Sequence, residues 1–324
     1  MRNGRKPPSH SLHSASDSRI SVTIPDAAIA TAGPWTHRNV SANGARFHCV
    51  DMGTGPAVLL LHGFPSFWWT WRELIAPLAA AGYRVIAMDL RGYGGSDHPP
   101  QGYDPTTLAR DCVSVIRSLG EVKATVVGHG VGAVIGWTMA AQHPDAVTAL
   151  ISVAGAHPRV LRHSLLRNNA QRLGLSHLAR LQLPFIPERY YTKNGGVNIG
   201  NFLERYSYNP SWVTPEVREV IQAAYQNWPT AHTAIEFHRW AIRSLYRTDG
   251  RRFQESVEKR IGAPVLDILG EHDPMIIYDL VENESMVSGS YTRQIMPTGH
   301  FPHEENPYAF AELLLPWLRQ HAGT

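Results

Sequence analysis

The chain has only two cysteines in 324 residues, Cys49 and Cys112. Two cysteines exclude a disulfide framework and a cysteine-rich metal site. Cys112 falls on the apolar face of an expected helix, where a reduced thiol behaves as a small hydrophobic side chain. We therefore expect two reduced core thiols in a cytoplasmic protein, with no metal and no cofactor.

Long hydrophobic runs are absent as well. The longest apolar runs, such as Ala57 to Leu61, fall far short of the roughly 20 residues of a membrane-spanning helix. The formal net charge of +3 is too small to indicate a nucleic-acid partner. These absences leave a globular enzyme or a binding protein for small molecules as the expected class.

The first 34 residues lack both apolar periodicity and the apolar segment of a secretory signal. Their polar, Ser-rich composition is typical of a disordered tail. The alternatives are a start codon placed too far upstream and a transit peptide, to which the Arg and Ser content has a weak likeness. In each case the folded part is expected to begin near Trp35.

From Trp35 onward, short apolar stretches alternate with amphipathic helical stretches. The expected strands are 46–52, 57–61, 84–90, 124–128, 147–153, 264–269 and 292–296. One expected helix begins at Asp104-Pro105, an N-cap followed by proline, and ends at Gly120. Alternation of this kind predicts an α/β fold with a mainly parallel sheet that helices cover on both faces.

Residues 157–256 interrupt this alternation. They show no buried-strand pattern, and they carry 14 Lys or Arg against 7 Asp or Glu, a net charge of +7. We interpret this segment as a helical insertion that lies over the sheet. Its positive charge either favours an anionic ligand or partner, or belongs to a solvated helical surface.

Four short motifs follow expected strands, at the edge where open parallel sheets place their sites. They are His62-Gly63-Phe64-Pro65, the stretch DLRGYGGS at 89–96, the turn VVGHGVGA at 126–133, and GEHDP at 270–274 together with GHFPHEE at 299–305. The turn VVGHGVGA has the small-residue frame of a sharp strand-to-helix turn beneath a nucleophile. The residue at its tip, Gly130, has no side chain.

In this order and spacing, the motifs resemble those of the α/β-hydrolase family. The stretches HGFPSFWW, DLRGYGGSDHP and GHFPHEENP are most similar to those of epoxide hydrolases, with haloalkane dehalogenases as near relatives. The resemblance covers residues 35–324. It implies a core of residues 35–156 and 257–324, with a mostly parallel eight-stranded sheet and helices on both faces, and a helical cap at residues 157–256.

The resemblance also implies roles for several residues. His300 is implied as the base, and Asp273 as the acid that orients its imidazole and stabilises its charged form. The backbone N–H groups of Phe64 and Val131 are implied as an oxyanion hole, which needs no particular side chain.

The nucleophile departs from the family pattern. Epoxide hydrolases carry Asp at the place of Gly130, and ester hydrolases carry Ser. A residue at this tip has positive φ, which glycine adopts at little cost, so Gly130 indicates a turn freed from catalytic demand. Val131 stands where epoxide hydrolases have a bulky Trp, and His177 and Ala241 stand where they have two cap tyrosines that act as acids. Concurrent departures favour natural divergence over a single engineered change.

Seven further residues are candidates to line a pocket at this site. They are His62, Pro65, Trp68, His129, His177, Trp240 and Tyr246. His129 is next to the tip of the turn, although a side chain at that place is expected to point away from the site. The tryptophans around Trp68 and the aromatic residues of 157–256 favour a small apolar molecule as the ligand.

Three functions remain open from the sequence. In the first, the protein binds a small ligand or a partner and does no chemistry. In the second, the His300–Asp273 pair acts as a general base on water or on a substrate proton, without a covalent step. In the third, a conventional hydrolase acts through an unidentified nucleophile.

Overall fold

The computed structural model describes residue 1, residues 29–226 and residues 228–322. The tail expected at residues 1–34 therefore lies mostly outside the described residues. Cys49 and Cys112 are both buried free thiols, as their sequence positions indicated. Within the described ranges, no helix combines the length and the apolar character needed to cross a membrane.

An eight-stranded, mostly parallel sheet forms the centre of the fold, as predicted. Its strands are β1 (Thr36–Ala42), β2 (Ala45–Met52), β3 (Ala57–Leu61), β4 (Arg84–Met88), β5 (Ala124–His129), β6 (Val147–Val153), β7 (Val265–Gly270) and β8 (Tyr291–Met296). They lie side by side in the order β1-β2-β4-β3-β5-β6-β7-β8. β1 and β2 form an antiparallel hairpin and β2 runs antiparallel to β4, whereas every later neighbouring pair is parallel.

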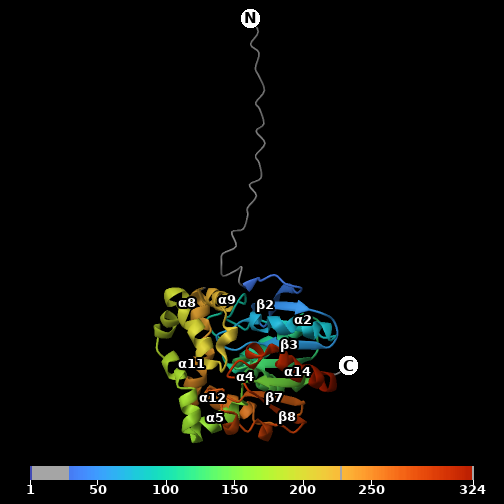
Figure 1. The fold of residues 1–324 in the computed structure, drawn as a ribbon, viewed down its shortest axis with the longest axis vertical. Helices are drawn as coiled ribbons and strands as arrows, with labels where there is room; N and C mark the ends of the chain where they lie inside the picture. Colours follow the sequence, from blue (N-terminus) through green and yellow to red (C-terminus); the bar gives the residue numbers. More distant parts are fainter. Residues whose placement is uncertain (2–28, 227, 323–324) are drawn as a thin grey trace.

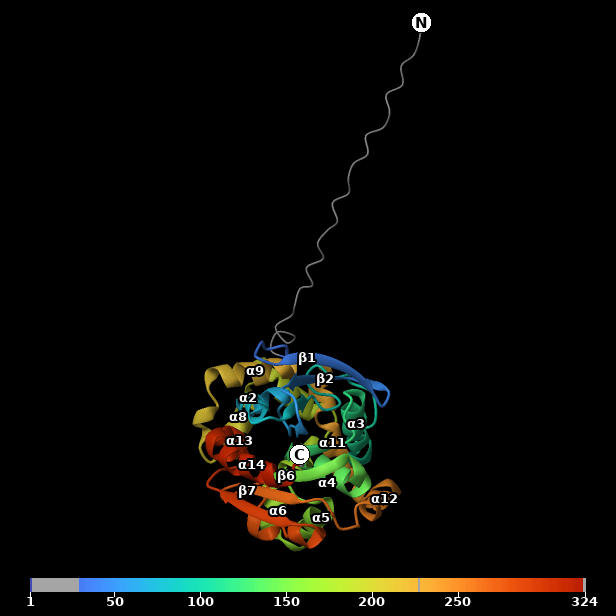
Figure 2. The same ribbon diagram turned by 90° about the vertical axis from the view of Figure 1, so that its right-hand side faces the viewer.

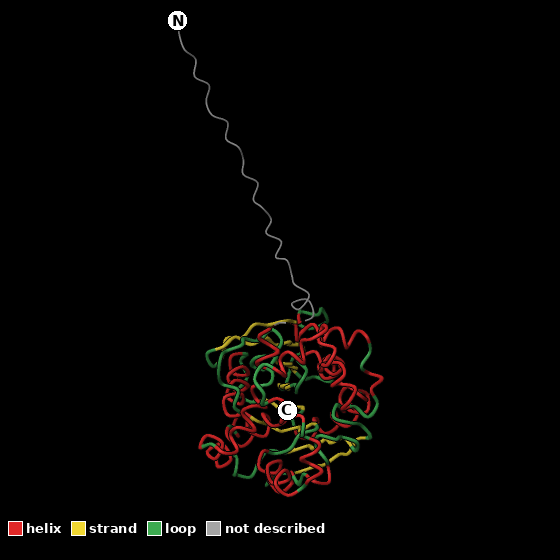
Figure 3. The backbone as a smooth tube through the Cα atoms, turned by 90° about the vertical axis from the view of Figure 1, so that its left-hand side faces the viewer, coloured by secondary structure: helices red, strands yellow, loops and turns green. Residues whose placement is uncertain are grey.

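β1 is the strand that the sequence analysis missed. Val40 and Ala42 are its buried residues, and most of its other side chains are exposed. β1 is the edge strand of the sheet, seen at the outer edge of the molecule in Figure 3, and α3 (Pro105–Ser118) packs against it. An edge strand of this kind has little apolar pattern, because few of its side chains face the core.

Helices cover both faces of the sheet. The helix α2 (Arg72–Ala80) packs against α14 (Pro307–His321), and α3 (Pro105–Ser118) packs against α4 (Val131–Gln142). Figure 2 shows these two pairs on opposite sides of the sheet. β3 lies between the helical layers and is buried at every residue, which explains its continuous apolar sequence.

Between β6 and β7 the described chain forms helices and turns, and no strand. The α-helices are α5 (Pro158–Arg167), α6 (Asn169–Gly174), α7 (His177–Leu181), α8 (Ile186–Tyr206), α9 (Pro215–Gln226), α10 (Trp228–Thr233), α11 (Glu236–Arg243) and α12 (Thr248–Ser256). Figure 1 shows these helices gathered at the left of the sheet. We refer to residues 157–256 as the cap.

Asp89 follows β4 and holds the DLRGYGGS loop in place. Its Oδ1 accepts the Trp68 N–H at 2.8 Å, and its Oδ2 accepts the Gly95 N–H at 2.9 Å. Nδ1 of the buried His48 lies 2.8 Å from the same Oδ2. Gly94 has a φ of +50°, and a Cβ at this position would collide with the Asp89 carboxylate. The motif therefore has a structural role at this end of the sheet.

Replacing Gly94 by alanine should destabilise the protein more than replacing Gly82 by alanine. Both glycines have positive φ, so both variants acquire backbone strain, but a Cβ on Gly82 meets no atom within 4 Å. We expect the free energy of unfolding to fall by about 3 kcal/mol for Gly94→Ala and about 1 kcal/mol for Gly82→Ala. Urea denaturation measures both, and equal losses would show that the Asp89 contacts do not hold the loop.

Candidate active site

The VVGHGVGA turn joins β5 to α4 and has a sharp, left-handed backbone at its tip. Gly130 has a φ of +53° and a ψ of −111°. Its N–H donates to the Val153 carbonyl at 3.0 Å, which ties the tip of the turn to the end of β6. A residue with a Cβ rarely adopts positive φ, whereas glycine does so without strain.

His300 and Asp273 lie in hydrogen-bond contact beside this turn. Nδ1 of His300 donates to Oδ2 of Asp273 at 2.8 Å, and both side chains are buried. The other carboxylate oxygen, Oδ1, accepts the N–H groups of Met275 at 2.7 Å and Ile276 at 3.1 Å. A neutral imidazole that carries its proton on Nδ1 keeps Nε2 as an acceptor.

Nε2 of His300 points at the tip of the turn. A Cβ built on Gly130 would lie 3.5 Å from this nitrogen and 3.8 Å from the Cα of Gly63. These are ordinary van der Waals distances, so position 130 has room for the first atom of a side chain. The acceptor nitrogen therefore faces the place where the side chain of a nucleophile would begin.

His129 supports His300 from the opposite side and points away from the tip of the turn. Nε2 of His129 donates to the His300 carbonyl at 2.8 Å. The His129 ring is fully buried, and this burial lowers its pKa well below the ordinary value. His129 is therefore a neutral residue that positions the backbone of His300.

The backbone segments of Phe64 and Val131 border the same place. Phe64 follows β3 and Gly63, and Val131 is the first residue of α4. Both residues line one cavity together with Gly130. The first N–H groups of a helix have no acceptor within the helix, and the helix dipole favours negative charge at this end. The start of α4 at Val131 therefore suits the binding of a negatively charged oxygen.

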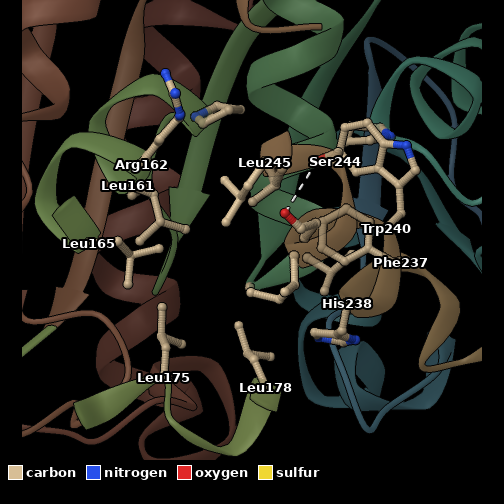
Figure 4. Close-up of a pocket in the computed structure, with 18 of the residues that line it drawn as sticks. Leu161, Arg162, Leu165, Leu175, Leu178, Phe237, His238, Trp240, Ser244 and Leu245 are labelled. Carbon is tan, nitrogen blue, oxygen red and sulfur yellow. Dashed lines mark hydrogen bonds between the residues drawn. The ribbon is translucent and has the colours of Figure 1, made fainter. Parts of the chain in front are cut away.

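A cavity of about 370 Å³ lies between the cap and this edge of the sheet, and Gly130, Val131 and His300 line its sheet side. Figure 4 shows the apolar side chains of the cap side: Leu161, Leu165, Leu175, Leu178, Phe237, Trp240 and Leu245. A cavity of this size and lining suits a small, mainly apolar molecule.

Three of the seven candidate pocket residues line this cavity, namely His177, Trp240 and Tyr246. The other four, His62, Pro65, Trp68 and His129, are buried elsewhere and do not line it. Pro65 belongs to a turn that the Ser66 N–H closes on the Gly63 carbonyl at 2.9 Å. These four residues therefore do not border this cavity, and for His129 this agrees with the expectation that its side chain points away from the site.

His62 and Trp68 have structural partners that explain their burial. Nε2 of His62 accepts the Leu90 N–H at 3.0 Å. The indole N–H of Trp68 donates to the Ile29 carbonyl at 2.8 Å, and its ring meets Trp35 edge to face. Both side chains therefore stabilise the loops around the sheet edge, and these polar atoms bind the backbone and do not face the cavity.

His238 lines the cavity with His177, and the sequence analysis missed it. Burial lowers the pKa of His177 to about 4 and that of His238 to about 3, so both rings are neutral at neutral pH. No side chain among the described residues hydrogen-bonds either ring. The available signal for His238 was its place three residues before Ala241, on the same face of α11.

The sheet side of the cavity contributes His300 with its partner Asp273, and the cap contributes His177 and His238. In the part of the chain that the structure describes, no three His, Cys, Asp or Glu side chains are grouped as metal ligands. The arrangement offers a hydrogen-bonded base, two neutral imidazoles and backbone N–H groups around an apolar space. Groups of this kind can move a proton and stabilise a polarised oxygen.

Comparisons with known proteins agree with this architecture. A family model described as alpha/beta hydrolase fold matches residues 56–307. The AB hydrolase superfamily protein YfhM of Bacillus subtilis is 40% identical over 285 residues, which are 86% of this chain and 96% of that protein. Epoxide hydrolase 3 of Xenopus tropicalis is 29% identical over 284 residues, which are 86% of this chain and 76% of that protein.

A solved structure extends the likeness to three dimensions. Epoxide hydrolase A from Mycobacterium thermoresistibile matches with a TM-score of 0.76 and 24% identity, over 89% of this chain and 99% of that one. At this identity the likeness concerns the fold alone. Together with the family model and the sequence relatives, the sheet and its strand-end motifs show that this chain belongs to the α/β-hydrolase family, as an epoxide-hydrolase-like member.

Proposed function

We propose that this protein hydrolyses a small apolar epoxide by direct attack of water, with His300 as the general base. The observation that carries the proposal is the orientation of His300. Asp273 holds Nδ1 at 2.8 Å, and Nε2 faces Gly130, whose Cβ position is 3.5 Å away. The relatives named epoxide hydrolases suggest the substrate class.

The reaction needs one base and one polarised oxygen. Nε2 of His300 takes a proton from water while the water oxygen attacks an epoxide carbon. The carbon–oxygen bond of the ring breaks, and the epoxide oxygen takes up a proton, which His300 or solvent returns. The product is a vicinal diol, and Asp273 stabilises the imidazolium that forms between the two proton transfers.

His177 and His238 support the opening of the ring in this proposal. Each is neutral at neutral pH, because burial lowers its pKa, so neither brings a charge into the cavity. The single N–H of each ring lies near a backbone group, that of Gly174 for His177 and that of Ala234 for His238, and it has to turn to the epoxide oxygen when the substrate binds. Donors of this kind stabilise the negative charge that develops on the oxygen. The backbone N–H groups of Phe64 and Val131 serve the same purpose for an ester substrate.

The alternative is a binding protein that does no chemistry. Gly130 favours it, because no side chain at that position can form a covalent intermediate. The third possibility, a hydrolase with another nucleophile, predicts a covalent adduct on that residue. An experiment can separate the three functions. Turnover without an adduct supports the proposal, a covalent adduct supports a hydrolase with another nucleophile, and binding without turnover supports the binding protein.

Replacing His300 by alanine should lower the rate of epoxide hydrolysis by about 10²–10⁴-fold, because the general base is lost. Asp273→Asn should also lower the rate, since the imidazole loses its orientation and the support of its charged form. His163→Ala, at an exposed cap position, is the control. Diol formation from a styrene-oxide-type substrate, with intact-mass spectrometry for adducts, measures these effects. A parent protein without turnover supports the binding protein instead.

Replacing Gly130 by aspartate should cost about 1–3 kcal/mol of stability, because a Cβ enters a rarely populated backbone region. The new carboxylate should be alkylated slowly by reactive epoxides, with little turnover, since the cap tyrosines of the family are absent. Gly130→Ala is the matched control, with the same strain and no carboxylate. Thermal melts and intact-mass spectrometry give both quantities. An alanine variant more stable than the parent would contradict the strain, and equal hydrolysis by parent and Asp variant would contradict a vacated nucleophile.

A further inference from the structure

The cavity wall carries positive charge and no negative charge. Arg162, Arg247 and Arg251 line it, and no Asp, Glu or Lys is among its described lining residues. All three arginines are exposed, so they mark the place where the cavity opens to solvent. We call these three residues the arginine rim.

Two members of the arginine rim have no acidic partner. Nε of Arg247 pairs with Asp249 at 3.1 Å. Neither Arg162 nor Arg251 forms an ion pair with any described residue. Their charges are therefore available to a ligand, and they belong to a cap segment whose net charge is +7.

The rest of the cavity separates the arginine rim from the reacting end. Figure 4 shows Arg162 at one end of the group of leucines and His238 at the opposite end. The side chains between them include Leu161, Leu165 and Leu245, which are apolar. A molecule that fills this space therefore meets guanidinium groups at one end and imidazoles at the other.

We propose that the cavity binds an amphipathic anion, with a carboxylate or phosphate head group at the arginine rim and an apolar body along the leucines. Guanidinium groups pair well with both head groups, and an apolar wall favours a hydrocarbon body. The part of the body opposite the head group then lies at His238 and His177, and His300 interacts with His177. The reacting end rests on the proposed function, whereas the binding mode does not.

Calorimetric titration with octanoate, octyl phosphate and octanol tests the proposal. At about 0.01 M salt, where charges are weakly screened, we expect octanoate or octyl phosphate to bind about tenfold more tightly than octanol. The preferred anion identifies the head group. At about 1 M salt the preference should shrink, because the Debye length falls to about 3 Å.

The double variant Arg162→Gln/Arg251→Gln should lose the preference for the anion and keep the affinity for octanol. Arg167→Gln/Arg189→Gln, at exposed cap positions outside the cavity lining, is the matched control and should keep the preference. Equal binding of anion and alcohol, a preference that survives in the first double variant, or no binding of any probe would overturn the proposal.

His300→Ala separates this proposal from the proposed function. The variant should bind the preferred anion as the parent does, because His300 interacts with His177, and His177 with His238, which lies at the end of the leucines opposite Arg162 in Figure 4. Anion binding without any hydrolysis in the parent would overturn the proposed function alone. Hydrolysis by a parent protein that shows no preference for anions would overturn the proposed anion binding at the arginine rim and leave the proposed function standing.

Discussion

The candidate site depends on the parallel pairing of the strands from β3 to β8. Parallel strands end at one edge of the sheet, so the residues that follow them meet there. Gly130 follows β5, Asp273 follows β7 and His300 follows β8, although the whole cap separates the first from the other two. A shift of one residue in the register of any of these strand pairs would turn the side chains of that strand to the other face of the sheet, and the three residues would no longer meet.

Burial then divides the histidines of this region into separate roles. His129, His177 and His238 are buried without a carboxylate partner, and the loss of solvation lowers the pKa of each. His300 has a carboxylate partner, because its Nδ1 donates to Asp273. The same region therefore holds three neutral imidazoles beside one imidazole that a carboxylate orients.

Gly130 and the cap histidines are consistent with one altered chemistry. A side chain at position 130 would have to tolerate a φ of +53°. Glycine removes that strain, and the Cβ position in front of His300 Nε2 meets no atom closer than 3.5 Å. A base that acts on water needs such a space, whereas a covalent mechanism needs a side chain in it. The space in front of His300 Nε2 is therefore compatible with the proposed attack of water.

The sequence by itself determined the fold class, because apolar strands alternate with amphipathic helices and because the strand-end motifs occur in a recognisable order. It also indicated Gly130, Asp273 and His300, since each stands in a motif that follows a strand and that resembles a motif of the family. Edge strand β1 escaped prediction because exposed strands have little apolar pattern.

Only the tertiary structure decided which side chains line the cavity. His62 and Trp68 stand in prominent motifs, yet their hydrogen bonds to the Leu90 N–H and the Ile29 carbonyl turn them inward. His238 lies in an inconspicuous helix, yet the packing of the cap brings it to the cavity. The direction in which a side chain points and the extent of its burial depend on residues that are far away in the chain. The local sequence around His62, Trp68 or His238 therefore does not predict whether the side chain lines the cavity.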